Sequence, residues 1–458
     1  MRYCSPEAMM HEEQTPLSAD PGDTASVGGA AVGPHRLRVR SLKVHEFRDV
    51  RRGSELTFSD GVHLALGQNG SGKSTLVELI AAVAAIDFGG PFFTATPFHI
   101  EARLELGPIT LHVDARREFE PVRLRSVGEK YVDLPPRDEA DVLVKVEVPG
   151  VLQQWLRARS GEALVRYDFD PREDHRPGEP IRLLGGVNPL RLTTSHAISH
   201  GATIPHDGGL RVHPAVWDAW RRVSEQPGTA APYDEALGAL SSLVGGGLTV
   251  VRGDSARVGS PWLPPSLDFD SKNGEPVEVD LGRDPLLASA IRQLGFDSAR
   301  AYFGPGAHWS VGWRYAAPTV QFFHDGRGVR RHDQLSFGQQ RLFSFAWYLA
   351  CNPDIAVADE LVNGLHADWI DWCVDAIGDR QCFLTAQSPL LVDAVRFDSE
   401  DQLRKGIIVC EARRADSGAG TEISLRQLDD REAALLTSAY RQSRLDLLSD
   451  LLRALDLW

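Results

Sequence analysis

The first half of the chain shows two different hydrophobic periods. Apolar and polar residues alternate from Leu37 to His45, as in an edge strand, and Glu55–Phe58 and Val62–Leu66 are predicted to be two further strands. Thr75–Ile86 is a long apolar run with alanine clusters, which predicts a helix that is buried on most sides. A strand, a glycine-rich turn and a buried helix are therefore expected to follow one another here.

Period-two alternation returns further along and predicts an antiparallel region. His99–Leu106 and Ile109–Ala115 flank a Gly-Pro turn and are expected to form a hairpin, and Val142–Val148 is predicted to be another strand. Residues 171–210 are dense in Pro, Gly and His, a composition that is typical of irregular loops.

The last part of the chain alternates strands with helices. Helices are predicted at Pro214–Glu225, Tyr233–Val244, Pro285–Leu294, 337–350 and 366–377, and strands at Thr319–Phe323, Val329–Arg331, Asp354–Ala358 and Gln381–Thr385. The Asp325-Gly326 pair has the turn chemistry of a hairpin. Strands that alternate with helices indicate an α/β sheet with helical crossovers.

Composition excludes several classes of protein. In 458 residues, 49 Lys+Arg against 63 Asp+Glu give a net charge of −14, which argues against non-specific coating of nucleic acid but leaves a local basic face open. No apolar run approaches the roughly 20 residues of a membrane span, and no signal peptide is indicated. Five cysteines without CxxC spacing indicate a reducing, cytoplasmic compartment.

The most specific motif follows the strand predicted at 62–66. The segment Gly67-Gln-Asn-Gly-Ser-Gly-Lys-Ser-Thr75 fits GxxxxGK[ST] and lies between a strand and a helix. Its glycines let backbone N–H groups converge on phosphate oxygens, Lys73 can reach the β and γ phosphates, and Ser74 can ligate Mg²⁺. ATP binding is therefore assigned to Gly67, Gln68, Asn69, Gly70, Ser71, Gly72, Lys73, Ser74 and Thr75.

A second motif is the apolar strand that ends in Asp359 and Glu360. Asp359 can hold Mg²⁺, and Glu360 can polarise the water that attacks the γ-phosphate. An apolar strand that ends in Asp-Glu is common by itself. Its position downstream of the phosphate loop is what favours these two roles for Asp359 and Glu360.

A third motif, Leu335-Ser-Phe-Gly-Gln-Gln-Arg341, opens the helix predicted at 337–350. It has two interpretations. In the first, Ser336 is an ordinary N-cap and Gln339 completes a capping box. In the second, the Ser and Gly form another anion-binding helix N-terminus, and the position just before the Asp-Glu strand favours this interpretation.

Together, the three motifs resemble the ATP-binding-cassette (ABC) ATPase superfamily, and more narrowly its RecF/SMC/OLD-related branch, often called AAA-family or AAA-like ATPases. Leu42–Arg48 resembles the opening strand motif of that branch, and Asp359–His366 resembles its Asp-Glu…Asn-Gly-Leu-His stretch. Thr385-Ala-Gln-Ser-Pro389 occupies the place of its Thr-x-His-Ser-Pro-like switch. The resemblance covers residues 37–90 and 315–458.

The chain departs from the family at the switch, where Gln387 replaces the usual His. Gln can donate a hydrogen bond to the γ-phosphate but carries neither a proton nor a charge, so slow turnover or a bias toward the ATP-held state is expected, unless His366 or another group substitutes. No Q-loop glutamine is assigned. The chain after Pro389 is too short for the nuclease domain that many members carry, so a separate nuclease or effector is the expected partner.

The resemblance implies an α/β fold of the P-loop NTPase type, an ABC-type cassette with an antiparallel β lobe and a mostly helical insertion. The expected parts are a disordered segment (1–35), the N-terminal half of the cassette with the β lobe (36–150), an insertion of mixed loops and helices (151–314) and the C-terminal half of the cassette (315–458). The residue roles that it implies are Ser336, Gly338 and Gln339 as a signature acting in trans, Ser74 and Asp359 as Mg²⁺ ligands, and Glu360, Lys73 and Gln387 as catalytic groups.

The implied mechanism is a homodimer in which two subunits sandwich two ATP molecules. The expected protein is a cytoplasmic ATPase, outside the membrane, that drives or gates a nuclease or effector in DNA maintenance or anti-phage defence; nucleic acid is left open as a partner. One alternative is an ATP-gated scaffold with little turnover. Another, disfavoured by the long gap before the signature, is the ATP-binding subunit of a membrane transporter.

Three other features receive their ordinary interpretation. The basic stretch between Arg36 and Arg52 is expected to be the solvated face of an edge strand rather than a nucleic-acid contact. His196 and His200 could share a helical face, but zinc binding is not expected without a nearby carboxylate motif. The tryptophans expected in the core and in interfaces are Trp217, Trp220, Trp262, Trp309 and Trp313.

Overall fold

The structure is a computed structural model whose described residues belong to one unit, His35–Trp458. The described residues are 36–85, 96–107, 109–117, 125–127, 130–132, 140–148, 152–161, 164–169, 181–182, 203–206, 209–212, 248–251, 264, 266–267, 274–309, 312–315, 318–414, 420–442 and 447–458. The segment 1–35, the helices predicted at 214–225 and 233–244, the pair His196 and His200, and three of the five tryptophans lie outside them.

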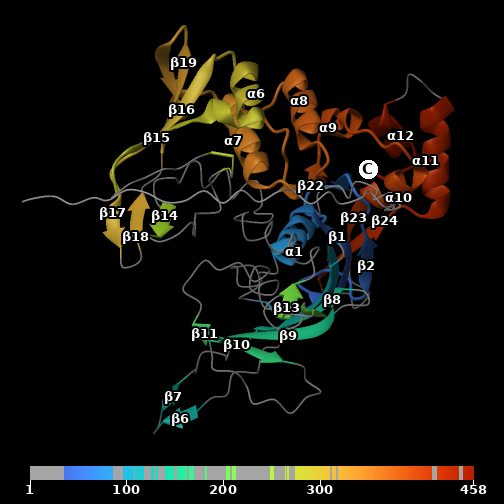
Figure 1. Ribbon diagram of the computed structural model, residues 1–458. Coiled ribbons are helices and arrows are strands. Elements are labelled where there is room, and N and C mark those ends of the chain that lie inside the picture. Colours follow the sequence, from blue (N-terminus) through green and yellow to red (C-terminus); the bar gives the residue numbers. More distant parts are fainter. Residues whose placement is uncertain are drawn as a thin grey trace, which may run out of the picture. The chain divides into compact units, whose positions relative to one another are not determined.

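A five-stranded sheet carries three of the predicted motifs. Its strands, in spatial order, are β21 (Ile355–Ala358), β22 (Gln381–Ala386), β3 (Val62–Leu66), β23 (Ile407–Arg414) and β24 (Thr421–Gln427). The first four are parallel to one another, and β24 is antiparallel to β23. Figure 1 labels β22, β23 and β24 of this sheet. The predicted strand–helix alternation and the mixed α/β class are therefore confirmed.

Alternate residues of this sheet enter two different hydrophobic cores, as the period of a β-strand requires. Ile355 and Val357 of β21 belong to a core that includes helix α1 (Lys73–Ala85) and the first antiparallel strands. Ala356 and Ala358 belong to the other core. Three helices of that second core are α7 (Phe337–Cys351), α8 (Ala367–Ile377) and α9 (Pro389–Ala394). Both faces of the parallel strands are thus covered by apolar side chains, which is the usual condition for such strands.

The antiparallel region is an eight-stranded sheet. In spatial order its strands are β11 (Ile181–Arg182), β10 (Leu164–Phe169), β9 (Leu152–Gly161), β8 (Ala140–Val148), β5 (Ile109–Arg117), β4 (Phe98–Leu106), β1 (Leu37–Phe47) and β2 (Ser54–Thr57). The predicted hairpin of β4 and β5 is confirmed. The prediction that the first strand is an edge strand is wrong, because β1 pairs with β2 on one side and β4 on the other.

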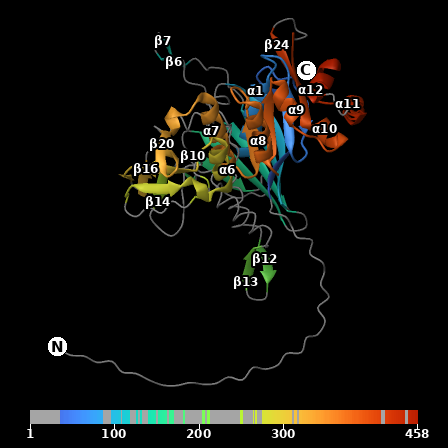
Figure 2. The same cartoon turned by 90° about the horizontal axis from the view of Figure 1, so that it is seen from above.

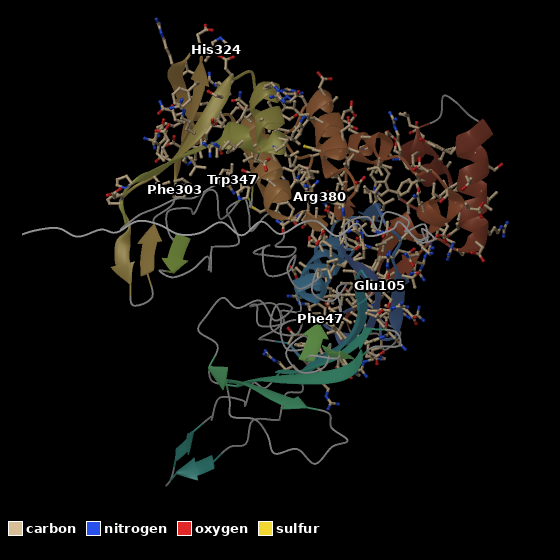
Figure 3. All side chains as sticks on the ribbon, viewed as in Figure 1. Phe47, Glu105, Phe303, His324, Trp347 and Arg380 are labelled. Carbon is tan, nitrogen blue, oxygen red and sulfur yellow. The ribbon has the colours of Figure 1, made fainter. Side chains whose placement is uncertain are left out.

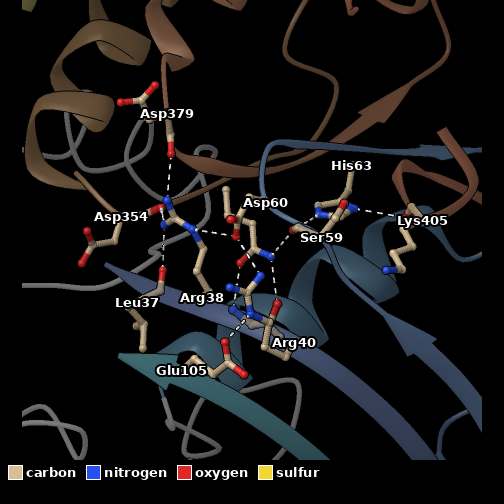
Figure 4. A network of polar contacts seen from close by, with 12 residues as sticks. Leu37, Arg38, Arg40, Ser59, Asp60, His63, Glu105, Asp354, Asp379 and Lys405 are labelled. Carbon is tan, nitrogen blue, oxygen red and sulfur yellow. Dashed lines mark hydrogen bonds and ion pairs between the residues drawn. The ribbon is translucent and has the colours of Figure 1, made fainter. Parts of the chain in front are cut away.

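The basic stretch between Arg36 and Arg52 is a solvated face only in part, because Arg48, Arg51 and Arg52 are exposed as predicted and Arg38 is not. Arg38 is buried, and its guanidinium donates to the carbonyl oxygens of Asp354 at 2.9 Å and Asp379 at 2.8 Å (Figure 4). Burial lowers the pKa of this guanidinium. The neighbouring Arg40 donates to Asp60 Oδ1 at 2.7 Å. Arg38 faces inward because it satisfies backbone carbonyls that the surrounding elements bring to β1, whereas Arg40 stays partly exposed.

The second half adds a smaller sheet and further helices. A four-stranded sheet has the order β15 (Val277–Asp280), β16 (Ser298–Phe303), β19 (Thr319–His324) and β20 (Arg327–Arg331), and α6 (Pro285–Gln293) packs on α7. The helices α10 (Glu400–Gly406), α11 (Asp430–Gln442) and α12 (Leu448–Ala454) pack in succession (Figures 1 and 2). Two single-turn 3₁₀ helices are η1 (Leu281–Arg283) and η2 (His332–Gln334).

The prediction of a mostly helical insertion at 151–314 stays a prediction, because the helices expected at 214–225 and 233–244 lie outside the described residues. Within the described residues this segment contains α6, η1 and several strands, of which β9 to β11 extend the hydrogen-bond ladder of β8. The remaining short strands are β6 (Arg125–Val127), β7 (Lys130–Val132), β12 (Thr203–His206), β13 (Gly209–Val212), β14 (Leu248–Val251), β17 (Ala307–Trp309) and β18 (Gly312–Tyr315).

The cysteines of the described segments are core residues. All four, Cys351, Cys373, Cys382 and Cys410, are free and buried, and burial raises the pKa of each thiol. In these same segments, none of the helices combines the length and the apolar character that crossing a bilayer requires.

Candidate functional site

The ends of three parallel strands bring the predicted motifs together. β3 runs into Gly67, β21 runs into Asp359, and β22 runs into Gln387. These strands are neighbours in the order β21, β22, β3, so their carboxyl ends open on one edge of the sheet. In open α/β sheets this edge is where ligands bind.

The phosphate loop needs glycine at two positions for reasons of space. Gly67 has a φ of 150°, and a Cβ there would lie 2.2 Å from the carbonyl oxygen of Cys410 and 2.5 Å from Ser71 Oγ. Gly72 has a φ of 94°, and a Cβ there would lie 2.4 Å from a methyl carbon of Ile423. Any other side chain at these positions would displace the loop from β23 and β24.

Lys73 is folded over the loop that precedes it. Its Nζ donates to the carbonyl oxygens of Gly67 and Gln68, each at 2.9 Å, and the residue is buried. An ammonium group has three donors, so these contacts leave donor capacity for an anion. The hydroxyl of Ser71 is buried and has no hydrogen-bond partner among the described residues. The loop therefore holds both a positive charge and an unused hydroxyl donor at the N-terminus of α1.

The two predicted Mg²⁺ ligands lie side by side. Ser74 Oγ donates to Asp359 Oδ2 at 2.6 Å, although the two residues are far apart in the sequence. The other carboxylate oxygen of Asp359 accepts a short hydrogen bond from Thr385 Oγ1 on β22. A hydroxyl and a carboxylate next to a phosphate-binding loop are the oxygen donors that Mg²⁺ requires, so the residues fit this ion.

Glu360 is held in an uncommon backbone conformation. Its φ is 48°, in the left-handed region, and its N–H donates to Thr385 Oγ1 at 2.8 Å. Both oxygens of its carboxylate accept from amides: Oε2 from Asn363 Nδ2 at 2.6 Å, and Oε1 from Gln387 Nε2 in a short contact. The side chain is therefore aimed by the two amides rather than left free in solvent.

The turn after β21 is fastened by Arg341. Its Nε donates to the carbonyl oxygen of Leu361 at 2.9 Å, its Nη2 donates to that of Glu360, and the residue is buried. No role was assigned to Arg341, Thr385 or Asn363 from the sequence. All three lie inside the quoted motif segments, and this position was the sequence feature that could have indicated a role for them.

The signature segment adopts its ordinary local structure. Gln339 N donates to Ser336 Oγ at 3.3 Å, and Ser336 N donates to Gln339 Oε1 at 3.0 Å, which completes the capping box of α7. A Cβ at Gly338 would lie 2.5 Å from the carbonyl oxygen of Gly364, so glycine is required by close packing. A capped helix start and a role in trans are compatible, and the second stays a prediction.

No protein-family model and no curated protein matches the chain. Among solved structures, the chain is similar to an SMC head bound to the C-terminal winged-helix domain of ScpA, with 12% identity and a TM-score of 0.30 over 85% of this chain and 98% of that one. It is also similar to the recombination mediator protein RecF of the RecFOR pathway with ATP, with 12% identity and a TM-score of 0.34 over 88% of this chain and 100% of that one. At these scores neither likeness carries an argument.

Proposed function

We propose that the chain binds ATP with Mg²⁺ at the phosphate loop and hydrolyses it, as an ABC-type ATPase of the RecF/SMC-like branch. One observation carries the proposal. The loop with Lys73 and Ser74, the acids Asp359 and Glu360, and the polar residue Gln387 follow three adjacent parallel strands and share hydrogen bonds. If the glycine-rich turn matched the phosphate-loop motif only by chance, the contact between Ser74 and Asp359 would have no explanation.

Each residue has a distinct part in this mechanism. The loop N–H groups and Lys73 bind the phosphates, and Ser74 and Asp359 hold Mg²⁺, which neutralises charge on the β and γ phosphate oxygens when bound. Thr385 fixes the rotation of the Asp359 carboxylate by donating to one of its oxygens. Glu360 orients the attacking water and accepts its proton through a lone pair that the two amides leave available on its carboxylate.

The quaternary mechanism is part of the same proposal. Two chains close on ATP, and Ser336, Gly338 and Gln339 of each reach the nucleotide of the other. Phe337, beside this segment, keeps 64% of its surface exposed, and Leu390, just past the switch, keeps 53%. These two side chains are the exposed apolar residues beside the motifs that the closed dimer would cover. The closed dimer would then drive a nuclease or effector in DNA maintenance or defence.

A second function, an ATP-gated scaffold with little turnover, is favoured by one contact. Gln387 Nε2 donates to Glu360 Oε1 and so takes up one of the acceptor sites through which this carboxylate could bind a water. An amide cannot accept and return a proton as the usual histidine can. The two proposals share the binding site and differ in rate.

Phosphate release from ATP, with and without DNA, tests the proposal. Glu360→Gln should keep ATP binding and lower turnover by roughly 10²- to 10⁴-fold, the contribution of one positioned base. Glu400→Gln, an exposed acid at the start of α10, is the matched control and should have the wild-type rate. Normal turnover in Glu360→Gln contradicts the catalytic assignment. If the wild type binds ATP but releases no phosphate, the result favours the second function, an ATP-gated scaffold.

A further inference from the structure

A cluster of histidines and acids lies on the antiparallel sheet, on elements that the nucleotide site does not use. His45 is on β1, His99 and Glu101 are on β4, and Asp114 is on β5. β4 lies between the other two strands, and Glu101 is directly opposite Asp114. All four side chains are partly exposed, between 30% and 49%, so the cluster borders on solvent.

The position of His45 results from a β-bulge. Val44 pairs with Ile100 and Glu46 pairs with His99, which leaves His45 as the extra residue of β1 without a partner in the register. Val44 is buried, whereas His45 and Glu46 are both partly exposed, so two successive residues leave the core face. Bulges re-aim side chains in this way and are frequent next to functional sites.

The bulge brings two imidazoles and a carboxylate into one small volume. The rings of His45 and His99 are stacked, with centroids 4.4 Å apart and an interplanar angle of 22°. His45 Nε2 lies 3.0 Å from Glu101 Oε1, and one possible ligand atom from each of these three residues lies within 4.8 Å of the others. His99 Nε2 lies 3.1 Å from Asp114 Oδ1.

One ring nitrogen in the cluster has no hydrogen-bond partner among the described residues. His45 Nε2 is buried at the atomic level and makes no hydrogen bond among the described residues, although Glu101 Oε1 is only 3.0 Å away. Glu101 and Asp114 place like charges directly opposite each other on neighbouring strands, which is unfavourable. Lys43 is paired in register with Glu101 and Arg116 with His99, yet neither supplies a partner for His45 Nε2.

We propose that His45, His99 and Glu101 bind a divalent transition-metal ion of the Zn²⁺ class. Imidazole and carboxylate together suit zinc-like ions, whereas Mg²⁺ prefers oxygen ligands alone. Asp114 Oδ1 lies 3.1 Å from His99 Nε2, and in the tautomer that donates to Asp114 the other ring nitrogen is the one offered to the ion, the usual arrangement around metal-bound histidine. Three protein ligands leave a fourth position for water or for a group from a partner.

Binding requires a small rearrangement. The two rings must turn out of their stack so that one nitrogen of each meets the ion at about 2.0–2.1 Å, the usual Zn–N distance. The alternative is a pair of histidine–carboxylate ion pairs with no ion, which the experiment distinguishes.

The test is zinc binding by the full-length chain in the presence of excess Mg²⁺, followed by calorimetry and, with Co²⁺ as the probe, by the visible absorption of the ion. His45→Gln and His99→Gln should each weaken Zn²⁺ binding by at least roughly 10-fold, and Asp114→Asn by roughly 10- to 100-fold. Excess Mg²⁺ should not displace the Zn²⁺.

The matched control is His324→Gln on β19 (Figure 3). His324 lies 3.5 Å from an oxygen of Asp297 and 3.8 Å from one of Asp325, so it also has two acids, but among the described residues it is not in a group that could hold a metal ion. The His324→Gln variant should bind Zn²⁺ as tightly as the wild type does. The proposal is overturned if the wild type binds no stoichiometric Zn²⁺, or if a His45→Gln/His99→Gln double variant binds it as tightly as the wild type.

Discussion

Removing one hydroxyl, in Thr385→Val, tests how the two acids of the candidate site, Asp359 and Glu360, are held. Thr385 is fully buried, and its Oγ1 accepts from Glu360 N–H at 2.8 Å while donating to Asp359 Oδ1. Valine keeps the β-branched shape but removes both bonds. An unsatisfied N–H costs about 1–3 kcal/mol, and a hydrogen bond to a charged group contributes about 1.5–3 kcal/mol. Water reaches the partly exposed Asp359 and Glu360, so we expect a loss of about 2–4 kcal/mol in the free energy of unfolding.

Urea unfolding of the full chain, with the ATPase rate measured in parallel, provides the assay. Thr385→Ser keeps the hydroxyl and should lose only about 1 kcal/mol, the contribution of one buried methyl group. Thr437→Val on α11 is a second control, because Thr437 Oγ1 is buried and has no hydrogen-bond partner among the described residues. That change should leave stability equal or higher. If Thr385→Val matches Thr385→Ser in stability and turnover, the reasoning about this hydroxyl is wrong.

Four further predictions concern the switch, the signature, the loop and a buried histidine. Gln387→His should raise turnover about 10-fold by restoring a proton-carrying group, and an unchanged rate in the phosphate-release assay would show that the amide does not limit it. Ser336→Arg should leave ATP binding intact but remove ATP-dependent dimerisation in light scattering; a variant that still dimerises reduces this segment to a capped helix. Gly67→Ala should abolish ATP binding, measured by calorimetry, because the new Cβ would lie 2.2 Å from the carbonyl oxygen of Cys410. Wild-type affinity in this variant would show that the close contact between the loop and β23 is not needed for binding. Burial lowers the pKa of His63 from 6.5 to about 4, so the unfolded chain takes up the proton first and stability falls as pH drops from 6.5 toward 4. Between pH 7 and pH 5 the free energy of unfolding should therefore fall by about 2 kcal/mol because of His63, and urea unfolding of His63→Gln should lack this loss. An equal pH dependence of the free energy of unfolding in the two proteins would refute the prediction.

The parts of the fold and site that could be predicted are those that a local pattern determines. The apolar alternation of β3, the glycines at 67 and 72 and the run that becomes α1 all lie within one short stretch, so period and motif suffice there. The apolar strand before Asp359 and the capping box of Ser336 are equally local.

What could not be predicted depends on pairing between distant segments. The two-sided pairing of β1 and the burial of Arg38 follow from strands and carbonyls far along the chain, which alternation alone does not reveal. The part of Arg341 depends on the path of the turn after β21. The stack of His45 on His99 depends on a bulge, which shifts the register by one residue and leaves no clear mark in the hydrophobic pattern.

The most direct test of the central claim is equilibrium binding of ATP to three proteins: the wild type, Lys73→Ala and Lys405→Ala. Lys405 donates to Asp401 Oδ2 at 2.8 Å on α10, so its loss removes the same charge away from the loop. The account predicts one ATP per chain for the wild type and Lys405→Ala, and no detectable binding for Lys73→Ala, because the phosphates lose their mobile cation. Wild-type affinity in Lys73→Ala would contradict the assignment of the loop as the nucleotide site.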